Sequence, residues 1–442
     1  MSVTRRRFLA GAAAALAEAG LGFPALAQAA KAVSPNEKIV VAHVGMGGMG
    51  MAHIGWFAGF PDVETAAVCD VDTARTEAAL ARLKELRPES RAVAETDFRR
   101  LLERPDIDVI TYATPDHWHA LSAILSFQAG KHVYGEKPLS YDMIEGQAML
   151  QACRRYGRVF QLGTQIHAGE TYHRVVELVR SGILGAIHTV RLWKVGGDSL
   201  TGFPPDSDPP PSLDWDMWLG PAPWRPYNRA ICPFTFRYFW DYSAGVFGDF
   251  WCHVADLPFW ALDLGAPLTV SATGSDPLDH IVTTPGFMDA EFEFPGLKMY
   301  WYSRIPDLPG AEGRGLGIQF VGTRGELVAD YESQVVFLDG KRYDDIPEVP
   351  VTLARSPGHQ RAFLDCVKSG GLPESNLDHA TRMTLPMHMA TIACRLGRKL
   401  TWDAARGEFV MDEAANRMRH RPYRAPWFLP VGRPTAGIGG CG

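Results

Sequence analysis

The sequence shows no excess of basic charge and no internal repeat. Its 442 residues include 44 Lys and Arg against 50 Asp and Glu, a formal net charge of −6, whereas proteins that bind nucleic acids are usually basic. A nucleic-acid partner is therefore not expected. Hydrophobic residues make up 46% and charged residues 21%, which is typical of soluble globular proteins and excludes disordered, collagen-like and membrane-channel classes. The length predicts about two domains.

Cysteines are few, and no pair has the spacing of a metal site. No CxxC occurs, and Cys232 and Cys252 stand twenty positions apart, so the cysteines predict no metal centre. We expect no metal and interpret the cysteines as small, buried apolar residues. They are Cys69, Cys153, Cys232, Cys252, Cys366, Cys394 and Cys441.

The N-terminal segment lacks an uninterrupted apolar run of membrane-spanning length, because Glu18 and Pro24 break it. A basic start, an apolar stretch and a small-x-small cleavage motif at Ala25-Leu26-Ala27, with Ala27-Gln28-Ala29 as the second choice, instead predict a secretory signal peptide over residues 1–30. Arg5-Arg6 resembles a twin-arginine signal. It predicts export of the folded protein by that machinery to the periplasm or beyond, with folding in a reducing compartment and no obligatory disulfides. An uncleaved membrane tether is the alternative.

Strands alternate with helices in the next part of the chain. This pattern predicts an α/β fold with a parallel sheet, a Rossmann dinucleotide-binding domain over residues 36–158. The expected strands are 39–44, 64–69, 109–113 and 132–134, and the expected helices are 73–87, 97–103 and 119–129.

The pattern changes after residue 158. Alternation over Glu291–Phe294 indicates a sheet with one wet face, and Pro295-Gly296 indicates a turn. We predict an α+β domain over residues 159–428 with an open, mostly antiparallel sheet, and a homo-oligomer built on that sheet. The expected strands are 187–193, 268–273, 288–294, 298–302 and 317–321, and the expected helices are 359–368 and 377–396.

A glycine-rich loop follows the first expected strand. Residues 45–50 read GMGGMG, and Asp70 ends the next strand, which is the context that a dinucleotide-binding motif requires. Its glycines allow the backbone to approach the pyrophosphate at a helix N-terminus. Asp70 can accept hydrogen bonds from the adenosine ribose and would repel a 2′-phosphate, so NAD is favoured over NADP, with NADP still possible.

Further motifs carry a resemblance to a known family. They are Glu136-Lys137-Pro138, the stretch 113–119 (ATPDHWH), the stretch 161–165 (QLGTQ), Asp249-x-x-x-His253, the stretch 215–221 (WDMWLGP) and the stretch 424–427 (RAPW). Together they resemble the Gfo/Idh/MocA oxidoreductases, the glucose–fructose oxidoreductase and inositol dehydrogenase group, in a secreted branch. The resemblance implies NAD(P)-dependent hydride transfer to or from a hydroxyl, with Lys137 and His253 in the active site.

Residue chemistry agrees with these roles. Histidine is the natural acid or base near neutral pH, and Lys137 can supply a cation and a hydrogen bond to the reacting oxygen. If residues 249–253 are helical, Asp249 and His253 share one face, and Asp249 can position His253 or substrate hydroxyls. The division of labour among these three candidate catalytic residues stays open.

Two further groups of side chains are candidates for the site. His117 and His119 could be metal ligands by type, but H-x-H points its rings apart, so we assign them to the cofactor loop. The candidate cofactor residues are Gly45, Met46, Gly47, Gly48, Met49, Asp70, Thr114, Pro115, His117, His119, Glu136 and Lys137. The candidate substrate contacts are Gln165, His167, Trp193, Arg237, Tyr238 and Trp240. Trp251 stands where the family branch has Gly, and it either narrows the pocket or points into the core.

Three functions remain open at this stage. The first is an NAD(P)-dependent oxidoreductase acting on a hydroxyl of a sugar, polyol or glycoside. The second is a glycoside hydrolase that uses a retained NAD for transient oxidation, elimination and re-reduction. The third is a sugar-binding protein without activity that keeps the Rossmann domain as a scaffold.

Overall fold

The computed structural model describes residues 37–196, 202–275, 280–344 and 347–430. The predicted signal peptide, its arginine pair and Cys441 lie outside these residues. None of the helices in the described ranges is both long enough and apolar enough to cross a membrane.

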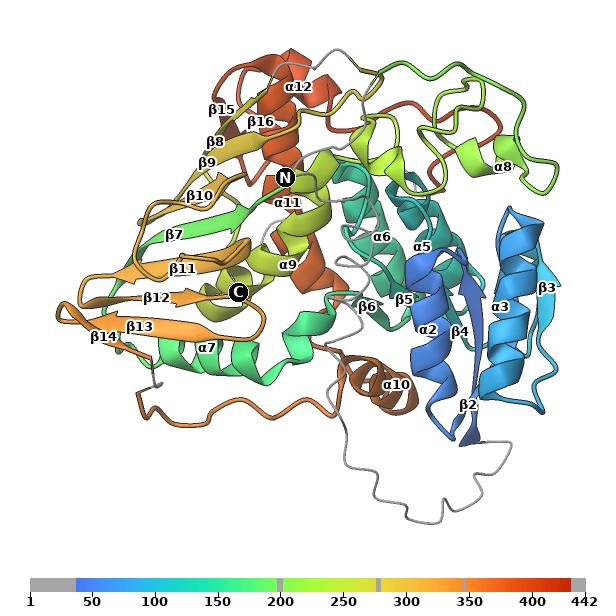
Figure 1. The fold of residues 1–442 in the computed structure, drawn as a ribbon, viewed down its shortest axis with the longest axis horizontal. Coiled ribbons are helices and arrows are strands. Elements are labelled where there is room, and N and C mark those ends of the chain that lie inside the picture. Colours follow the sequence, from blue (N-terminus) through green and yellow to red (C-terminus); the bar gives the residue numbers. More distant parts are fainter. Residues whose placement is uncertain (1–36, 197–201, 276–279, 345–346, 431–442) are drawn as a thin grey trace, which may run out of the picture. The chain divides into compact units, whose positions relative to one another are not determined.

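The first sheet is parallel throughout, in the order β3-β2-β1-β4-β5-β6 (Figure 1). Its strands are β1 (Ile39–Val44), β2 (Val63–Cys69), β3 (Val93–Glu95), β4 (Val109–Tyr112), β5 (His132–Gly135) and β6 (Phe160–Leu162). The helices that alternate with them are α2 (Gly48–Ala58), α3 (Thr73–Leu86), α4 (Phe98–Leu102), α5 (His119–Gln128) and α6 (Met143–Tyr156). The Rossmann prediction is confirmed.

Local sequence explains where these helices begin. Asp72, Asp97 and Asp142 each accept a hydrogen bond from a backbone N–H in the first turn of α3, α4 and α6, and such caps stabilise helix starts by about 1 kcal/mol. Gly157 ends α6 in the left-handed conformation, with φ of 60°, which glycine adopts without steric cost.

The second sheet has ten strands in the order β14-β13-β12-β11-β7-β10-β9-β8-β15-β16. All neighbours are antiparallel except β7 and β10. Its strands are β7 (Ile187–Lys194), β8 (Thr269–Gly274), β9 (Met288–Phe294), β10 (Leu297–Tyr302), β11 (Leu316–Gly322), β12 (Gly325–Ala329), β13 (Gln334–Leu338), β14 (Lys341–Tyr343), β15 (Leu400–Asp403) and β16 (Glu408–Phe409). The mostly antiparallel sheet is confirmed, whereas β12 to β16 were not predicted.

Two long helices cover one face of this sheet. They are α9 (Gly245–Leu262) and α11 (Leu377–Leu396), and α11 also packs on α6 of the Rossmann domain (Figure 1). The remaining helices are α7 (Glu170–Arg180), α8 (Trp215–Leu219), α10 (His359–Ser369) and α12 (Glu413–Arg417), with short 3₁₀ turns η2 (Asp116–Trp118), η3 (Gln165–Ala168) and η4 (Thr235–Tyr238).

The side chain of Trp251 belongs to this core. It is fully buried, its indole N–H donates to the Met383 carbonyl oxygen at 2.7 Å, and its ring packs against Phe292 and Trp301. Of the two expectations for Trp251, the pocket-narrowing one is therefore wrong. The six described cysteines are all free, three buried and three partly buried.

The stretch 203–242, which we call the crossing segment, returns from the second domain to the first. Thr73 N–H donates to the Ser212 carbonyl and Asp214 N–H to the Val71 carbonyl, both at 2.9 Å. The Trp218 carbonyl accepts hydrogen bonds from the rings of His117 and Trp118, both at 3.0 Å. The segment is thereby attached beside the carboxyl ends of β2 and β4.

Candidate active site

The glycine loop joins the end of β1 to the start of α2. Gly45 has a φ of 83°, and a Cβ there would lie 2.8 Å from the Ala113 carbonyl group. A Cβ on Gly50 would lie 1.8 Å from the Gly45 carbonyl oxygen. These two positions require glycine because the backbone segments approach one another too closely for any side chain.

The middle of the loop is open by contrast. A Cβ on Gly47 would meet only the Arg75 guanidinium, at 3.7 Å, and one on Gly48 would meet nothing within 4 Å. Gly47 caps α2 without any side-chain hydrogen bond, so the first N–H groups of this helix are available to a ligand. An uncapped helix start with an open backbone approach suits a pyrophosphate, and the loop therefore fits NAD.

Asp70 lies at the end of β2, beside this loop. Its Oδ2 accepts the Met46 N–H at 2.6 Å and its Oδ1 accepts the Asp72 N–H at 2.9 Å. Burial raises the pKa of Asp70, while these two backbone hydrogen bonds oppose the rise. Each carboxylate oxygen retains a lone pair that ribose hydroxyls can use. Asp70 thus shapes the loop as well as facing the expected ribose position.

The loops after β4 and β5 are held together by buried side chains. His119 contacts two carbonyl oxygens, that of Pro138 at 2.6 Å and that of Thr114 at 3.0 Å. Glu136 contacts His53 at 3.0 Å and accepts from the Gln165 amide at 2.8 Å. Burial alone would raise the pKa of Glu136, but His53 and Lys137 outweigh it and lower the pKa. Glu136, His119 and Gln165 therefore position the loops rather than presenting free side chains.

Lys137 and Asp249 meet although they are 112 residues apart in sequence. The Lys137 ammonium donates to Asp249 Oδ1 at 2.7 Å and to the Asp249 carbonyl oxygen at 3.2 Å. The Arg237 Nε lies 3.4 Å from the same Oδ1. Burial would raise the pKa of Asp249, but the two cations outweigh it and hold the pKa well below its usual range. The carboxylate is thus ionised and anchors Lys137 at the end of the loop after β5.

His253 lies one turn after Asp249 on α9, so the condition under which the two side chains share one helix face is met. Its Nδ1 is buried without a hydrogen-bond partner in the described part of the chain. Burial and the neighbouring Lys137 cation lower the pKa of His253 to about 4, against the pull of Asp249. The imidazole is therefore neutral at pH 7 and able to accept a proton.

The prediction that Trp193 in β7 contacts the substrate is wrong. It is fully buried, its indole N–H donates to the Arg314 carbonyl oxygen at 2.8 Å, and a Cβ on Gly317 would lie 2.3 Å from its ring. Side chains alternate along a strand, so Lys194 points to the other face. Its ammonium lies 4.8 Å from the centroid of the Phe250 ring, and Lys194 interacts electrostatically with Asp249. Alternation was the signal that could have identified Lys194.

The other predicted side chains divide between the site and its surroundings. Arg237 joins Asp249 and stacks on Phe236, with its guanidinium carbon 4.6 Å from the ring centroid. Trp240 is partly buried and faces the Arg395 guanidinium at 5.3 Å. The Tyr238 carbonyl accepts N–H groups from residues 283 and 284. His117 and His167 are both buried. The His117 Nε2 atom contacts the Trp218 carbonyl oxygen, and the His167 Nδ1 atom contacts Asp256. Neither of these nitrogens is therefore available to a ligand.

Asp116 was not among the predicted site residues. It is buried in η2, where its carboxylate accepts from the Ser243 hydroxyl. Burial raises the pKa of Asp116, partly offset by His119, Ser243 and Arg237. It connects the loop after β4 with the start of α9. The sequence did contain a signal for Asp116. It lies within the stretch 113–119, two residues after Thr114, which was itself a candidate cofactor residue.

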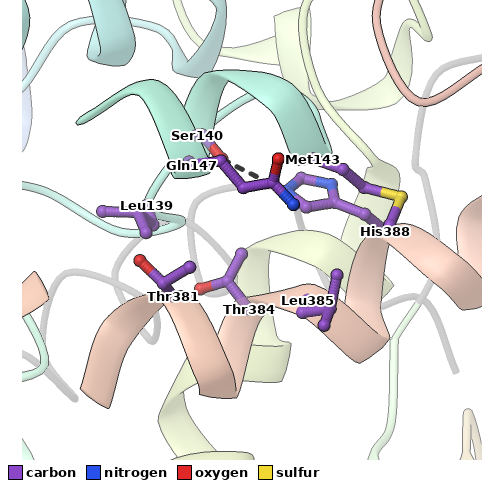
Figure 2. Close-up of a pocket in the computed structure, with 9 residues that line it drawn as sticks. Leu139, Ser140, Met143, Gln147, Thr381, Thr384, Leu385 and His388 are labelled. Carbon is purple, nitrogen blue, oxygen red and sulfur yellow. Dashed lines mark hydrogen bonds between the residues drawn. The ribbon is translucent and has the colours of Figure 1, made fainter. Parts of the chain in front are cut away.

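A pocket begins just after the Glu136-Lys137-Pro138 segment and lies between α6 and α11. Figure 2 shows Leu139 and Met143 on one side, Thr381 and Leu385 on the other, and the hydrogen bond of 3.2 Å between Ser140 and His388. None of these residues is a candidate cofactor or substrate contact, so this pocket is separate from the site around Lys137.

Comparison with solved structures supports the fold. The WlbA dehydrogenase from Bordetella pertussis, crystallised with NADH and UDP-GlcNAcA, superimposes with a TM-score of 0.61 at 19% identity, covering 83% of this chain and 99% of that one. The aldose–aldose oxidoreductase from Caulobacter crescentus gives 0.60 at 19% identity, covering 83% of this chain and 100% of that one.

Curated relatives are similar over a shorter stretch. An α-N-acetylgalactosaminidase of Shewanella oneidensis is 30% identical over 159 residues, 35% of this chain and 35% of the relative. A glycosyl hydrolase family 109 protein of Shewanella baltica is 31% identical over 204 residues, 42% of this chain and 44% of the relative. The matching stretch thus spans less than half the length of these relatives.

Two family models match most of the chain. Residues 39–164 match the model described as "Oxidoreductase family, NAD-binding Rossmann fold". Residues 169–283 and 318–429 match the one described as "Oxidoreductase family, C-terminal alpha/beta domain". With the glycine loop, Asp70 and the Lys137–Asp249 pair in place, these matches show that the chain belongs to the Gfo/Idh/MocA oxidoreductase family, with NAD as its cofactor.

Proposed function

We propose that this protein is an NAD-dependent oxidoreductase acting on a hydroxyl group of a sugar, polyol or glycoside. The observation that carries the proposal is the contact of Lys137 with Asp249, which lies one turn from His253. It unites a cation from the cofactor domain with an acid and a neutral imidazole from the substrate domain. NAD, when bound, supplies the hydride acceptor.

Each of the three side chains has a task that its surroundings suit. Two of the three ammonium N–H donors of Lys137 have partners in the described structure, both on Asp249, which leaves one donor for a substrate oxygen. That donor orients the hydroxyl and stabilises negative charge as it develops on the oxygen. His253 is neutral and accepts the hydroxyl proton. Asp249 holds Lys137 and, through it, the substrate.

A second function is favoured by the relatives named as glycosyl hydrolase family 109 proteins. In this alternative the same site would oxidise a glycoside transiently and the aglycone would be eliminated. Water would then add to the double bond that the elimination leaves, and the ketone would be reduced by the NADH retained from the first step. The redox balance then closes within one turnover, since the hydride removed in the first step returns in the last. The shared step is the oxidation at Lys137 and His253, so both functions use the residues described above.

One experiment separates these functions. The natively purified protein is denatured, released dinucleotide is identified by mass spectrometry, and the intact protein is incubated with a panel of glycosides and free sugars. Net NADH formation at 340 nm supports the dehydrogenase. Glycoside cleavage with bound NAD and no net NADH supports the hydrolase. A protein that carries no dinucleotide and turns over no substrate contradicts both and supports a binding protein.

Location and assembly complete the proposal. We propose export by the twin-arginine route, from Arg5-Arg6 and the segment at 1–30, and a homo-oligomer that pairs the outer faces of the ten-stranded sheets. That face carries Tyr300 stacked on Tyr302 and ion pairs such as Lys298 with Glu291. Fractionation of cells expressing the full chain tests the first, and light scattering at micromolar concentration tests the second.

A further inference from the structure

The Arg237 side chain is held in a fixed orientation at the candidate active site. Its guanidinium carbon lies 4.5 Å from the centroid of the Phe234 ring and 4.6 Å from that of the Phe236 ring. Its Nη1 donates a hydrogen bond to the Phe234 carbonyl oxygen at 3.0 Å. Because these contacts orient the guanidinium in advance, it loses little conformational entropy when it binds a ligand.

Most of the hydrogen-bonding capacity of this guanidinium is unused. An arginine side chain has five N–H donors, and the bond to the Phe234 carbonyl is the one hydrogen bond that the Arg237 side chain donates within the described residues. Its Nε lies 3.4 Å from Asp249 Oδ1, but that oxygen already accepts the Lys137 ammonium at 2.7 Å. The Arg237 side chain is 25% exposed, so its free donors are open to a ligand.

Several cations surround the single carboxylate of Asp249. Lys137 and Arg237 contact the same oxygen of it, and in the described part of the chain neither has an ion pair with any other carboxylate. Lys194 is partly buried against the Phe250 ring, and burial lowers its pKa while Asp249 opposes the change. Three cations thus act on one carboxylate. A partly buried cation without an anion of its own is unfavourable, so the site has room for a further negative charge.

Two other carboxyl groups near these cations have partners elsewhere. Asp116 accepts a hydrogen bond from the Ser243 hydroxyl, and burial raises its pKa. Glu136 contacts His53 at 3.0 Å and accepts from the Gln165 amide at 2.8 Å. Neither carboxyl group forms an ion pair with the three cations in the ranges that the structure describes. They therefore do not supply a direct anionic partner for the guanidinium.

The position of Arg237 relates it to the reacting hydroxyl. Because Lys137 and Arg237 contact the same Asp249 oxygen, at 2.7 and 3.4 Å, their two nitrogen atoms are no further apart than the sum of these distances. A single pyranose ring is large enough to place a hydroxyl at the first nitrogen and a carboxylate at the second. The cofactor does not supply this anion, since its pyrophosphate is assigned to the glycine loop.

We propose that Arg237 is a specificity-determining residue that binds a carboxylate of the substrate, so that the sugar oxidised at this site is a uronic acid or a uronic acid glycoside. The inference rests on the proposed function and names its substrate class. A guanidinium pairs with a carboxylate through two parallel N–H···O hydrogen bonds, and the free donors of Arg237 supply them. Lys194 adds attraction at longer range. The substrate carboxylate takes no part in the hydride transfer.

The test compares matched substrates that differ only at C6, with the NAD-loaded full-length protein. The pairs are 4-nitrophenyl glucosides with glucuronides and galactosides with galacturonides, each in both anomeric forms. The kcat/KM values are measured from NADH formation and from nitrophenol release, so that redox and hydrolytic turnover are both detected. In the pair that is accepted, we expect the acid to be preferred by about 10-fold or more. Arg237→Gln should bring the ratio close to unity, mainly through KM, because the carboxylate is bound equally before and during the reaction.

Two further variants sharpen this result. Arg237→Lys keeps the charge but loses the planar pair of donors, so it should retain only part of the preference for the acid. Arg229→Gln, at an exposed arginine of the same crossing segment, leaves the preference unchanged. Melting temperatures and NAD titration show that each variant is folded and binds the cofactor.

The outcomes separate this inference from the proposed function. The inference is overturned, while the proposed function stands, if the wild-type protein turns over the neutral sugars as well as the acids. It is also overturned if Arg237→Gln keeps the full preference. If the NAD-loaded protein turns over no member of the panel, the proposed function is contradicted, and calorimetry decides the inference. Tighter binding of glucuronate or galacturonate than of glucose or galactose, lost in Arg237→Gln, supports the carboxylate site, and equal binding overturns it.

Discussion

The two halves of the active site are built in different ways. The first half consists of the backbone groups of the glycine loop with the Asp70 carboxylate beside them, drawn from the 26 positions from Gly45 to Asp70. The second half consists of side chains, with Lys137 meeting Asp249 from 112 residues away. A backbone site tolerates almost no added atoms where segments touch, whereas a side-chain site depends on charge and partners. The difference teaches that the first half is sensitive to shape and the second to chemistry.

Removing the Lys137 charge tests the chemical half and should have the largest effect. In Lys137→Met, turnover falls by about 10³-fold or more, because the cation and hydrogen bond at the reacting oxygen are lost. NAD affinity, measured by fluorescence titration, changes little. Lys84→Met, at an exposed lysine on α3, is the control and keeps full activity. Wild-type turnover in Lys137→Met contradicts the proposed function.

The tryptophans of the second domain sharpen the comparison, because most of them serve packing rather than chemistry. Trp251→Ala removes a fully buried ring and should lower the free energy of unfolding by about 3–5 kcal/mol. Trp224 is 66% exposed, and Trp224→Ala should change it by less than about 0.5 kcal/mol. Urea unfolding measures both. Equal losses in the two variants would mean that Trp251 is not a core residue.

Single methyl groups test the backbone half. Gly50→Ala places a Cβ 1.8 Å from the Gly45 carbonyl oxygen, so both the loop and NAD binding are lost. Gly47→Ala has room in the unliganded protein. It should keep the melting temperature but weaken NAD binding by about 10-fold, since the methyl group occupies the pyrophosphate approach. Gly55→Ala, further along α2, is the matched control, because a Cβ there also meets nothing within 4 Å. Calorimetry that finds unchanged NAD affinity in Gly47→Ala would contradict the loop assignment.

Buried histidines in both domains should make the free energy of unfolding depend on pH, and this is the smallest effect per residue that we predict. Burial lowers the pKa of His132 in the first domain and of His388 in the second to about 4 each. The unfolded chain takes up these protons near pH 6.5 while the folded protein does not, so stability falls as the pH drops from 6.5 towards 4. Each histidine contributes about 1 kcal/mol of loss between pH 7 and 5.5. His132→Gln and His388→Gln should reduce this loss equally.

Glu145 acts in the opposite direction. Burial, with Asp142 nearby, raises its pKa to about 8, so its contribution to stability falls as the pH rises from 4.5 to 8. His43, His253 and His359 share the lowered pKa of the first group. They outnumber His167 and His420, whose pKa values are raised by Asp256 and Asp142 against the effect of burial, so we expect the loss of stability at low pH to prevail. Urea unfolding at pH 7 and 5.5 checks the sign, and a protein that is more stable at pH 5.5 would refute it.

Sequence periodicity predicted much of the fold because it reports local burial. The strands 288–294 and the helix 377–396 match the structure residue for residue. The strands β12 to β16 were not predicted. Two of them, β14 and β16, are only three and two residues long, and β12 follows β11 after a short turn. The helix α7 also lay in a stretch for which no element was predicted. Short edge strands owe their form to neighbours that the sequence does not reveal.

The site was predictable only where residue type determines the role. Lys137, Asp249 and His253 were identified because their motifs resemble a family, and α9 brings the last two together. The partners of buried polar side chains were not predictable. Neither the pairing of His167 with Asp256 nor that of Glu136 with His53 leaves a local signal, because each joins residues more than 80 positions apart.

The crossing segment also bears on how this enzyme could be re-engineered. Because the stretch 203–242 hydrogen-bonds to residues 71 and 73 and to the rings at 117 and 118, the cofactor domain is not a self-sufficient module. A chimaera that grafts a new substrate domain onto this Rossmann sheet would inherit unmatched backbone groups beside the dinucleotide. A chimaera designed to change the substrate specificity must therefore take the crossing segment and the surface that it contacts from the same parent protein.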